Sequence, residues 1–308
     1  NYIFFSNHNS NLSESGNTFA SAGAIFDTHT LPITQSFTNG TDGYYLTSGQ
    51  KKAGIETYLG DAETQDVDFL ISGPLDGDDG SGNDVTTLAE ATTQANNLIA
   101  ICEARKDCMA IISPRKQDCV NNSGSESTSI VALADTLSSS SYAVMDSAWC
   151  YQYDKYTDNY CYVPACVHTA GVMARSDTER DAWFSPAGFN RGQILGITKL
   201  SFNPNQAERD ALYKKRVNPI VTFPGQGTVL FGDKTLLSNA SAFDRINVRR
   251  LFIVMEKAIA TAAKFQLFEF NDAFTRAQFR ATIEPFLRQV KGRRGIVDFQ
   301  VVCDETNN

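Results

Sequence analysis

Residues 109–113, Met-Ala-Ile-Ile-Ser, form a short apolar run that Pro114 closes, a pattern typical of a buried β-strand. Runs of the same kind lie on either side of it in the sequence, VDFLIS at residues 67–72 and SYAVMDSA at residues 141–148. A glycine and a proline directly follow the first of these runs and break the chain there. The three runs predict strands of one sheet.

The two segments between these strands have helical periodicity. Apolar residues recur three and four positions apart within residues 93–105 and again within residues 127–137. Ser123 and Glu126 have the spacing of a capping box ahead of the second helix. Strands that alternate with helices through short connections predict a parallel sheet with crossover helices, which is an α/β fold.

The order of elements changes after residue 197. Asn203 and Pro204 have the residue types of a helix N-cap and first helical position, so we expect a helix from there to about residue 216. We expect a hairpin at residues 220–231, around the turn Pro-Gly-Gln-Gly.

Two long helical runs follow, at residues 245–265 and 272–290. We expect Pro285 to kink or divide the second run, because proline lacks the N–H group of a helical hydrogen bond. The segment 296–303 is predicted to be a strand near the end of the chain. Helices beside an antiparallel sheet predict an α+β domain.

These patterns divide the chain into three parts. Residues 1–50 are rich in Asn, Ser, Thr and Gly and predict a β/loop-rich segment. Residues 51–197 are predicted to form the α/β core, and residues 198–308 the α+β domain. Residues 151–160, YQYDKYTDNY, are polar and without periodicity, so we expect an exposed, mobile connection there.

The charge is distributed unevenly along the chain. Residues 1–197 hold 10 basic and 24 acidic residues, a net of −14, whereas residues 198–308 hold 17 and 11, a net of +6. Halves of opposite charge favour packing against copies of the same chain or against an acidic partner. Two domains with ordinary surface charge are the alternative interpretation.

The composition also argues against several classes of protein. A total charge of −8 is unfavourable for binding nucleic acid. No stretch reaches the roughly 18 uninterrupted apolar residues of a membrane-spanning helix. Because the chain begins at Asn1 and shows no signal peptide, we interpret it as an internal piece of a longer polypeptide.

Metal and nucleotide motifs are incomplete. The acidic loop at residues 76–84 lacks the glycine and glutamate of an EF-hand, and the glycines at 225–232 match neither a phosphate loop nor a dinucleotide-binding motif. A structural zinc site needs two close pairs of ligands. The candidates are Cys150, Cys161, Cys166 and His168, and they offer only one such pair, Cys161 with Cys166. We therefore predict no metal and no cofactor, and interpret the seven cysteines as buried, reduced thiols.

Little in the sequence indicates catalysis. The only histidines are His8, His29 and His168, and no Gly-x-Ser-x-Gly motif presents a nucleophilic serine. We therefore predict that the protein is not an enzyme and name no catalytic residue.

Basic side chains gather in the two long C-terminal helices and the turn after them. Pairs of arginines four residues apart repel each other, which suggests that carboxylates elsewhere compensate them. We propose these residues as contacts to a partner, with a solvated helix face as the alternative. They are Arg245, Arg249, Arg276, Arg280, Arg288, Lys291, Arg293 and Arg294.

Three further segments carry a family resemblance: FSPAGFNRGQI at 184–194, VLFGDKTL at 229–236 and RINVRRLF at 245–252. With the strand–helix pattern of about residues 65–150, they resemble the contractile-tail sheath proteins of phages, the T-even coliphage type in particular. The resemblance covers roughly residues 65–308; residues 1–50 carry none of it.

The resemblance implies a mechanical role. It implies a non-catalytic, subtilisin-like α/β core in a subunit of stacked hexameric rings, which surround a tail tube and contract to drive it through the host envelope for genome ejection. The implied partners are other sheath subunits, the tube protein, and baseplate and tail terminator proteins, with no nucleic acid and no membrane insertion. The implied location is the virion, after assembly in the host cytoplasm. The basic residues would then face the tube or a neighbouring subunit.

Two other classes of function stay open from the sequence. One is a subtilisin-like or α/β hydrolase that uses His168. The other is a carbohydrate-binding module, for which the aromatic platform would be Tyr151, Tyr153, Tyr156 and Tyr160.

Overall fold

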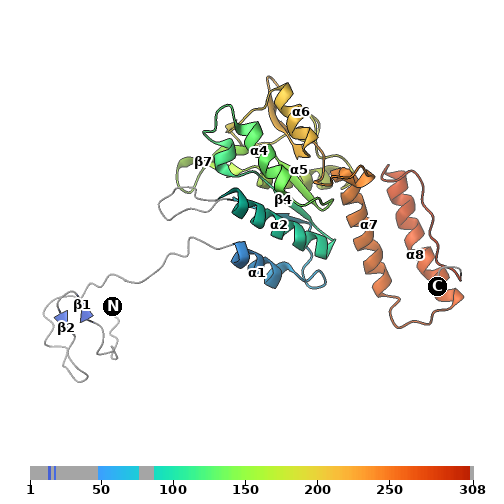
Figure 1. Cartoon of the computed structure of the whole chain (residues 1–308). Helices are drawn as coiled ribbons and strands as arrows, with labels where there is room; N and C mark the ends of the chain where they lie inside the picture. The colour runs from blue at the N-terminus through green and yellow to red at the C-terminus, as the bar shows by residue number, and fades with distance from the viewer. Residues whose placement is uncertain (1–12, 15–16, 19–47, 76–86, 306–308) are drawn as a thin grey trace. The chain divides into compact units, whose positions relative to one another are not determined.

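The computed structural model describes residues 13–14, 17–18, 48–75 and 87–305 (Figure 1). The chain divides into two units, Asn1–Gly43 and Tyr44–Asn308. The first contributes the antiparallel pair β1 (Ser13–Glu14) and β2 (Asn17–Thr18). His8, His29 and the acidic loop at 76–84 lie outside the described residues.

A four-stranded sheet lies at the centre of the second unit, and its strands follow chain order: β3, β4, β5 and β9. All neighbouring strands are parallel, which confirms the expected α/β fold. Ile111 of β4, for example, lies in register with Ile71 of β3 and Val144 of β5. The bounds are β3 Phe69–Ile71, β4 Met109–Ile112, β5 Ala143–Asp146 and β9 Val217–Asn218.

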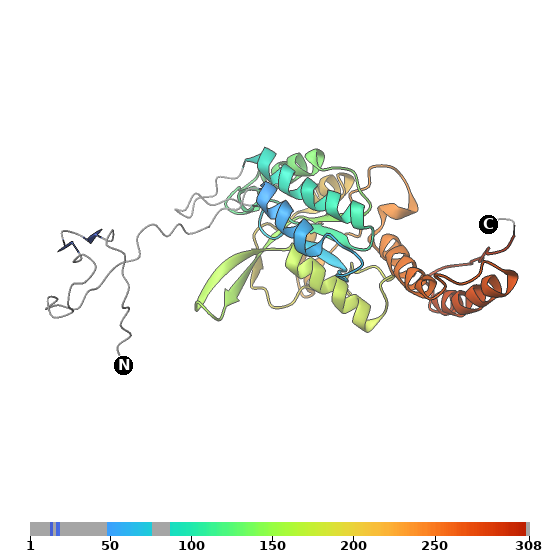
Figure 2. The same ribbon diagram turned by 90° about the horizontal axis from the view of Figure 1, so that it is seen from below.

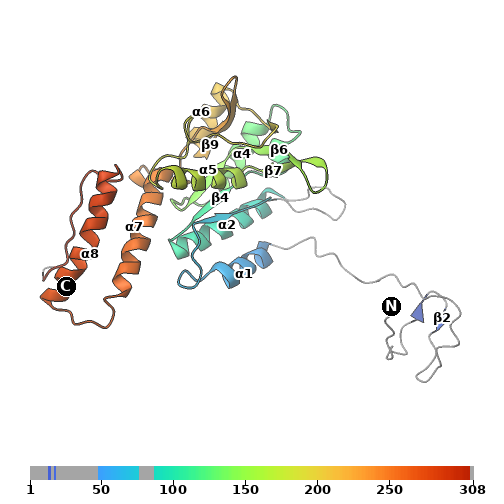
Figure 3. The same cartoon turned by 180° about the vertical axis from the view of Figure 1, so that it is seen from behind.

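Helices cover both faces of this sheet, because successive side chains of a strand point to opposite sides. Ala110 and Ile112 pack in one cluster with residues of α2, α4 and α6, and Met109 and Ile111 pack in another with residues of α5 and α7. In the view from behind, α5 crosses the sheet (Figure 3). The helices are α1 Ser48–Leu59, α2 Leu88–Arg105, α3 Lys116–Cys119, α4 Glu126–Thr136, α5 Cys166–Glu179, α6 Gln206–Lys214, α7 Ile246–Lys264 and α8 Ala273–Gly292.

Two predicted helix starts differ from the structure. Helix α6 is capped by Asn205, whose side chain accepts a hydrogen bond from the Glu208 N–H, while the Glu208 carboxylate accepts one from the Asn205 N–H. Asn203, the expected cap, instead bonds the Thr222 backbone, because a complete capping box follows two residues later. Helix α4 likewise starts after Ser125 without a side-chain cap, so the Ser123–Glu126 box is wrong.

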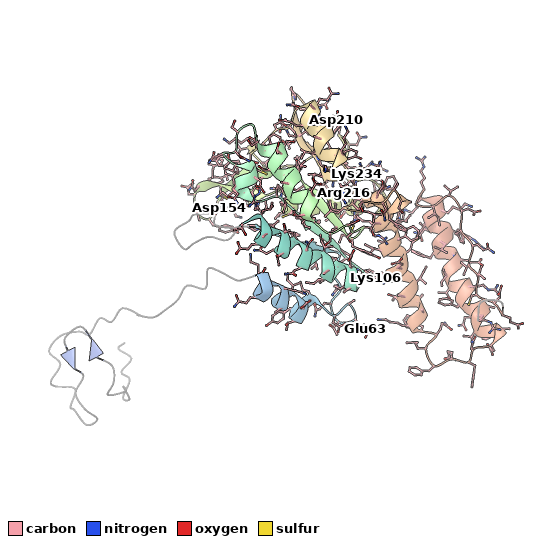
Figure 4. All side chains as sticks on the ribbon, viewed as in Figure 1. Glu63, Lys106, Asp154, Asp210, Arg216 and Lys234 are labelled. Carbon is pink, nitrogen blue, oxygen red and sulfur yellow. The ribbon has the colours of Figure 1, made fainter. Side chains whose placement is uncertain are left out.

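The segment 151–160, expected to be a mobile connection, is a β-hairpin. Strand β6 (Trp149–Asp154) pairs antiparallel with β7 (Asn159–Pro164), and β8 (Lys199–Leu200) adds to its other side. The tyrosines stabilise this pairing across the strands: the Tyr151 and Tyr160 rings stack with their centres 5.5 Å apart. The hairpin extends past the neighbouring helices in Figure 2, and Asp154 marks its end in Figure 4.

The C-terminal part holds the expected hairpin, β10 (Ile220–Phe223) with β11 (Gly227–Leu230). A 3-10 turn at Ala242–Asp244 then leads into α7. Helices α7 and α8 lie side by side (Figures 1 and 3). Pro285 lies inside α8 without dividing it.

The strand expected at residues 296–303 is not formed. Ile296, Phe299 and Val301 instead pack, half-buried, against the apolar seam between α7 and α8. A β-strand needs the edge of another strand with which to form hydrogen bonds. Within the described residues, this segment instead packs on two helices, which provide an apolar surface and no strand edge. No helix in the described part of the chain has the length and hydrophobicity that crossing a membrane requires.

Candidate assembly surface

The basic residues of the C-terminal helices begin with Arg245, immediately before α7. Its Nη1 lies 2.8 Å from Asp233 Oδ1 and 2.6 Å from the Tyr213 hydroxyl. The hydrogen bond with Asp233 raises the pKa of Arg245. The VLFGDKTL segment therefore supplies a carboxylate within the chain for this arginine, whose side chain is 43% exposed.

Arg249 lies between two aromatic rings instead of at a surface. Its guanidinium carbon is 4.3 Å from the centre of the Tyr142 ring and 4.0 Å from that of Phe243, and Nη1 donates to the Tyr142 hydroxyl at 3.2 Å. The residue is 8% exposed. This burial leaves Arg249 little surface for a partner, because the two rings already contact its guanidinium.

Arg250, which the sequence analysis did not single out, is the second buried arginine of α7. It forms an ion pair with Asp177 of α5 and lies over the Phe69 ring at 4.9 Å. Burial raises the pKa of Asp177, and the hydrogen bond from Arg250 opposes that rise. Arg250 follows Ile246 by four residues and precedes Ile253 by three, a spacing that places it on the apolar face of the helix.

Lys257 provides a second attachment of α7 to the core. Its Nζ lies 2.8 Å from Oδ1 of both Asp66 and Asp68, just before edge strand β3. Burial alone would lower the pKa of Lys257, but the hydrogen bonds with the two carboxylates raise it overall. The start and middle of α7 are thus joined by ion pairs to α5 and to the edge of the sheet.

Arg276 and Arg280, four residues apart on α8, line one open hollow of about 280 Å³ with residues 303–305. Arg276 donates to Asn271 Oδ1 at 3.0 Å and lies 3.7 Å from Glu305 Oε1. Arg280 forms no ion pair within the described ranges. The structure therefore brings this predicted pair together.

The other predicted basic residues are mostly compensated within the chain. Their ion pairs are Arg288 with Glu284 at 2.8 Å, Lys291 with Asp298 at 2.9 Å, and Arg293 with Asp181 at 2.9 Å. Arg294 is exposed, with a left-handed backbone (φ 66°), and has no ion pair among the residues the structure describes. Fewer of these basic side chains are therefore free of an ion pair, within the described residues, than the number of basic residues in the C-terminal helices suggests.

A buried polar cluster occupies the carboxyl ends of β4 and β5. The Ser113 hydroxyl donates to Asp146, with Oγ 2.8 Å from Oδ1, and accepts a hydrogen bond from the Cys166 N–H at 2.7 Å. Burial raises the pKa of Asp146 to about 7, and the hydrogen bond from Ser113 opposes the rise. Ser113 and Asp146 are both fully buried, so this cluster is closed to a substrate.

His168 takes no part in that cluster. Its Nε2 is buried without a hydrogen-bond partner, and burial lowers its pKa. A hydrolase needs the histidine within hydrogen-bond reach of the serine and the carboxylate. The described residues show no such contact, so the geometry gives the His168 alternative no support.

The thiols differ in part from the expectation. Cys161 is exposed on the β6–β7 hairpin and Cys303 is half-buried, whereas the other five are buried. No group of three or more potential metal ligands occurs among the described residues.

The connection between α7 and α8 has a feature that the sequence analysis missed. Together with the first turn of α8, it exposes five large apolar side chains, which we call the aromatic loop. They are Phe265 (79% exposed), Leu267 (63%), Phe268 (106%), Phe270 (84%) and Phe274 (75%). The density of Phe in KFQLFEFNDAF, between two amphipathic helices, is the signal that could have found it.

Comparison with known proteins identifies the fold. The family model described as the phage tail sheath protein central domain matches residues 49–236, and the phage tail sheath C-terminal domain matches residues 238–308. The chain belongs to the phage tail sheath protein family. This membership confirms the resemblance seen in the three sequence segments.

Curated relatives of this sheath family member include the tail sheath proteins of two phages. That of Vibrio phage KVP40 is 45% identical over 232 residues, 71% of this chain and 35% of the relative. That of Enterobacteria phage T4 is 38% identical over 294 residues, 89% of this chain and 43% of the relative. The chain thus spans about two fifths of the length of these relatives.

Solved structures share the fold at low sequence identity. The anti-feeding prophage baseplate in the contracted state aligns with a TM-score of 0.58 and 19% identity, over 82% of this chain and 68% of that one. The sheath complex of the extracellular contractile injection system PVC, also contracted, aligns with a TM-score of 0.56 and 22% identity, over 68% and 55%.

Proposed function

We propose that this protein is a structural subunit of a contractile phage tail sheath, which polymerises around the tail tube and contracts to drive the tube through the host envelope. One observation carries the proposal: two adjoining sheath domains account for residues 49–236 and 238–308. The 38% identity to the T4 tail sheath protein over 294 residues supports it.

The structure is physically suited to mechanical work without a cofactor. A subunit needs two ways of packing against its neighbours whose free energies differ by on the order of a few kcal/mol. Many subunits that change together multiply that free-energy difference. The parallel sheet between two helix layers gives each subunit a rigid body that can be carried from one packing to the other.

The finer features remain part of the proposal. The partners are other copies in stacked hexameric rings, the tube protein, and baseplate and tail terminator proteins; the location is the virion, after assembly in the host cytoplasm. The α/β core at residues 51–197 would be subtilisin-like and non-catalytic, with the C-terminal domain at 198–308. Strand β9, which pairs with β5, ties that second part into the core sheet.

The proposal is tested by electron microscopy of the full-length protein. Purified protein at micromolar concentration is expected to form hollow cylinders built of stacked rings, wider and shorter after a contraction trigger. A serine-reactive probe should leave the same preparation unlabelled. Only monomers at all concentrations, or a labelled serine, would contradict the proposal.

The exposed part of the predicted basic surface is a candidate contact to the tube or to a neighbouring copy. Arg280 and Arg294 have no ion pair among the described residues, and Arg276, whose ion pair is with Glu305, lines the same hollow as Arg280. Exposed ion pairs contribute about 0–1 kcal/mol each, so such contacts set register and release easily.

Charge reversal at Arg276 and Arg280 tests this contact. The double substitution to Glu is expected to raise the concentration needed for assembly about tenfold, the equivalent of about 1.4 kcal/mol, with an unchanged melting temperature. High salt should weaken assembly of the unmodified protein more than that of the variant. The matched control reverses Lys155, in the turn after β6, and Lys199 on β8. Equal effects of both double variants would show that only net charge matters.

A further inference from the structure

The aromatic loop exposes more apolar surface than a subunit that worked alone would keep. Its five large apolar side chains, Phe265 to Phe274, are each at least 63% exposed. Contiguous apolar surface of this kind marks an interaction site on soluble proteins. Other apolar side chains of α7 and α8, Leu251, Met255 and Ile283, are buried where the two helices pack together.

The backbone of the loop adds a second sign. Phe268 has a φ of 71°, a left-handed conformation that is a genuine outlier for a bulky side chain. Its ring is fully exposed, so no packing within the chain compensates the strain. Strain that the chain's own contacts do not offset points to a role outside the chain.

A second exposed aromatic surface lies on the same chain, around the β10–β11 hairpin. Phe189, Phe223 and Phe231 form a cluster with ring centres 5.2–5.9 Å apart. Phe189 is 42% exposed and Phe231 41% exposed. We call these three residues the aromatic cluster. The exposure of both surfaces shows that they do not cover each other within one chain.

Each surface carries charged side chains that have no ion pair within the described residues, and these side chains differ in sign between the two surfaces. Arg209 lies over the Phe223 ring at 5.5 Å and Arg191 over the Phe184 ring at 5.6 Å, beside the aromatic cluster. Neither arginine has a carboxylate partner in the described part of the chain. The aromatic loop carries the exposed Glu269, which likewise lacks a basic partner among the described residues.

We infer that the aromatic loop of one copy docks on the aromatic cluster of a neighbouring copy, with Glu269 facing Arg191 and Arg209. The inference rests on the proposed sheath function and names a contact through which copies would join. Because the two surfaces differ, the contact is head-to-tail, and a repeated head-to-tail contact builds a ring or a helix instead of a closed pair. Aromatic side chains and arginine are the residue types that dominate interface energies.

Site-specific photo-cross-linking in the full-length protein tests this contact. The variant Phe268→p-benzoylphenylalanine is assembled into cylinders from a mixture of unlabelled and ¹⁵N-labelled protein and then irradiated. Mass spectrometry is expected to find adducts on the peptides that contain residues 184–194 or 220–231, joining labelled to unlabelled chains. The control places the same probe at Tyr58 of α1, which is 76% exposed. It should give no adduct on those peptides.

The outcomes separate the two levels of the proposal. Cylinders whose Phe268 adducts lie within one chain, on the tube protein or elsewhere on the neighbouring copy would overturn this inference alone. Failure of the unmodified full-length protein to form any cylinder would overturn the proposed function and this contact with it.

A paired substitution gives an independent measurement. Phe268→Ala with Phe270→Ala is expected to raise the concentration needed for assembly more than tenfold. The melting temperature should not fall, because these rings are exposed and Phe268 is strained. Assembly at the unmodified concentration would overturn the inference.

Discussion

The Asp146→Asn variant is expected to gain about 4 kcal/mol of unfolding free energy relative to the unmodified protein as the pH rises from about 4 to about 8. Burial raises the pKa of Asp146 from 3.8 to about 7, against the hydrogen bonds from Ser113, Ala148 and Thr169. The folded state therefore favours the protonated carboxyl. The protonated Asp146 carboxyl stabilises the folded state fully at pH values below 3.8, its pKa in the unfolded chain. This stabilisation is lost as the pH rises through about 7, its pKa in the folded chain.

Urea unfolding at a series of pH values measures this difference. The thiols that face the carboxyl, Cys150 and Cys166, have pKa values that burial raises to about 12 and about 11, so they stay protonated in this range. The control is Asp210→Asn, at an exposed carboxyl on α6 (Figure 4), which should follow the unmodified protein at every pH. A difference between Asp146→Asn and the unmodified protein that does not change with pH would contradict the prediction.

Replacing Arg250 by methionine is expected to lower the unfolding free energy by about 3 kcal/mol at neutral pH, because it leaves the half-buried Asp177 without its partner. The loss should shrink at acidic pH, where Asp177 takes up a proton. Arg250→Lys keeps the charge but loses the planar contact with Phe69, so an intermediate loss is expected.

A double-mutant cycle separates the pair from its surroundings. Arg250→Met combined with Asp177→Asn should recover most of the loss, since no buried charge then lacks a partner. The control, Arg288→Met, removes an exposed pair with Glu284 and should cost less than about 0.5 kcal/mol. Additive effects of the Arg250 and Asp177 substitutions would show that the pair is not coupled.

The central sheet could be predicted because each buried strand carries its own signal. β4 and β5 are buried at every position, so their sequences are almost continuously apolar. Such apolar runs are easily recognised in the sequence. The β6–β7 hairpin was missed because its exposed strands are polar. Its signal lay in tyrosines at alternate positions, 151 and 153, which the pairing with Tyr160 and Tyr162 uses. Residues 296–303 were wrongly predicted to be a strand. Their sequence is typical of one, but they pack against α7 and α8, which have no strand edge with which to pair.

The candidate surface was only partly predictable, because compensation of charge depends on contacts that are distant in sequence. Arg250 meets Asp177 across 73 residues, and Arg249 meets Tyr142 across 107. Spacing along one helix identifies like charges on one face but not the carboxylates and rings brought there by other elements. The Arg276–Arg280 pair could be recognised in the sequence because both residues lie four positions apart on a single helix.

The attachment of α7 has a mechanical consequence. Its ion pairs to α5 and to the edge of the sheet lie at Arg250 and Lys257, whereas the aromatic loop begins after Lys264, about 10 Å farther along the helix axis. A load applied at the loop therefore acts as a torque on those ion pairs, with the helix as the lever. We expect the Lys257 ion pairs beside edge strand β3 to break first under such a load, before the hydrogen bonds at the centre of the sheet.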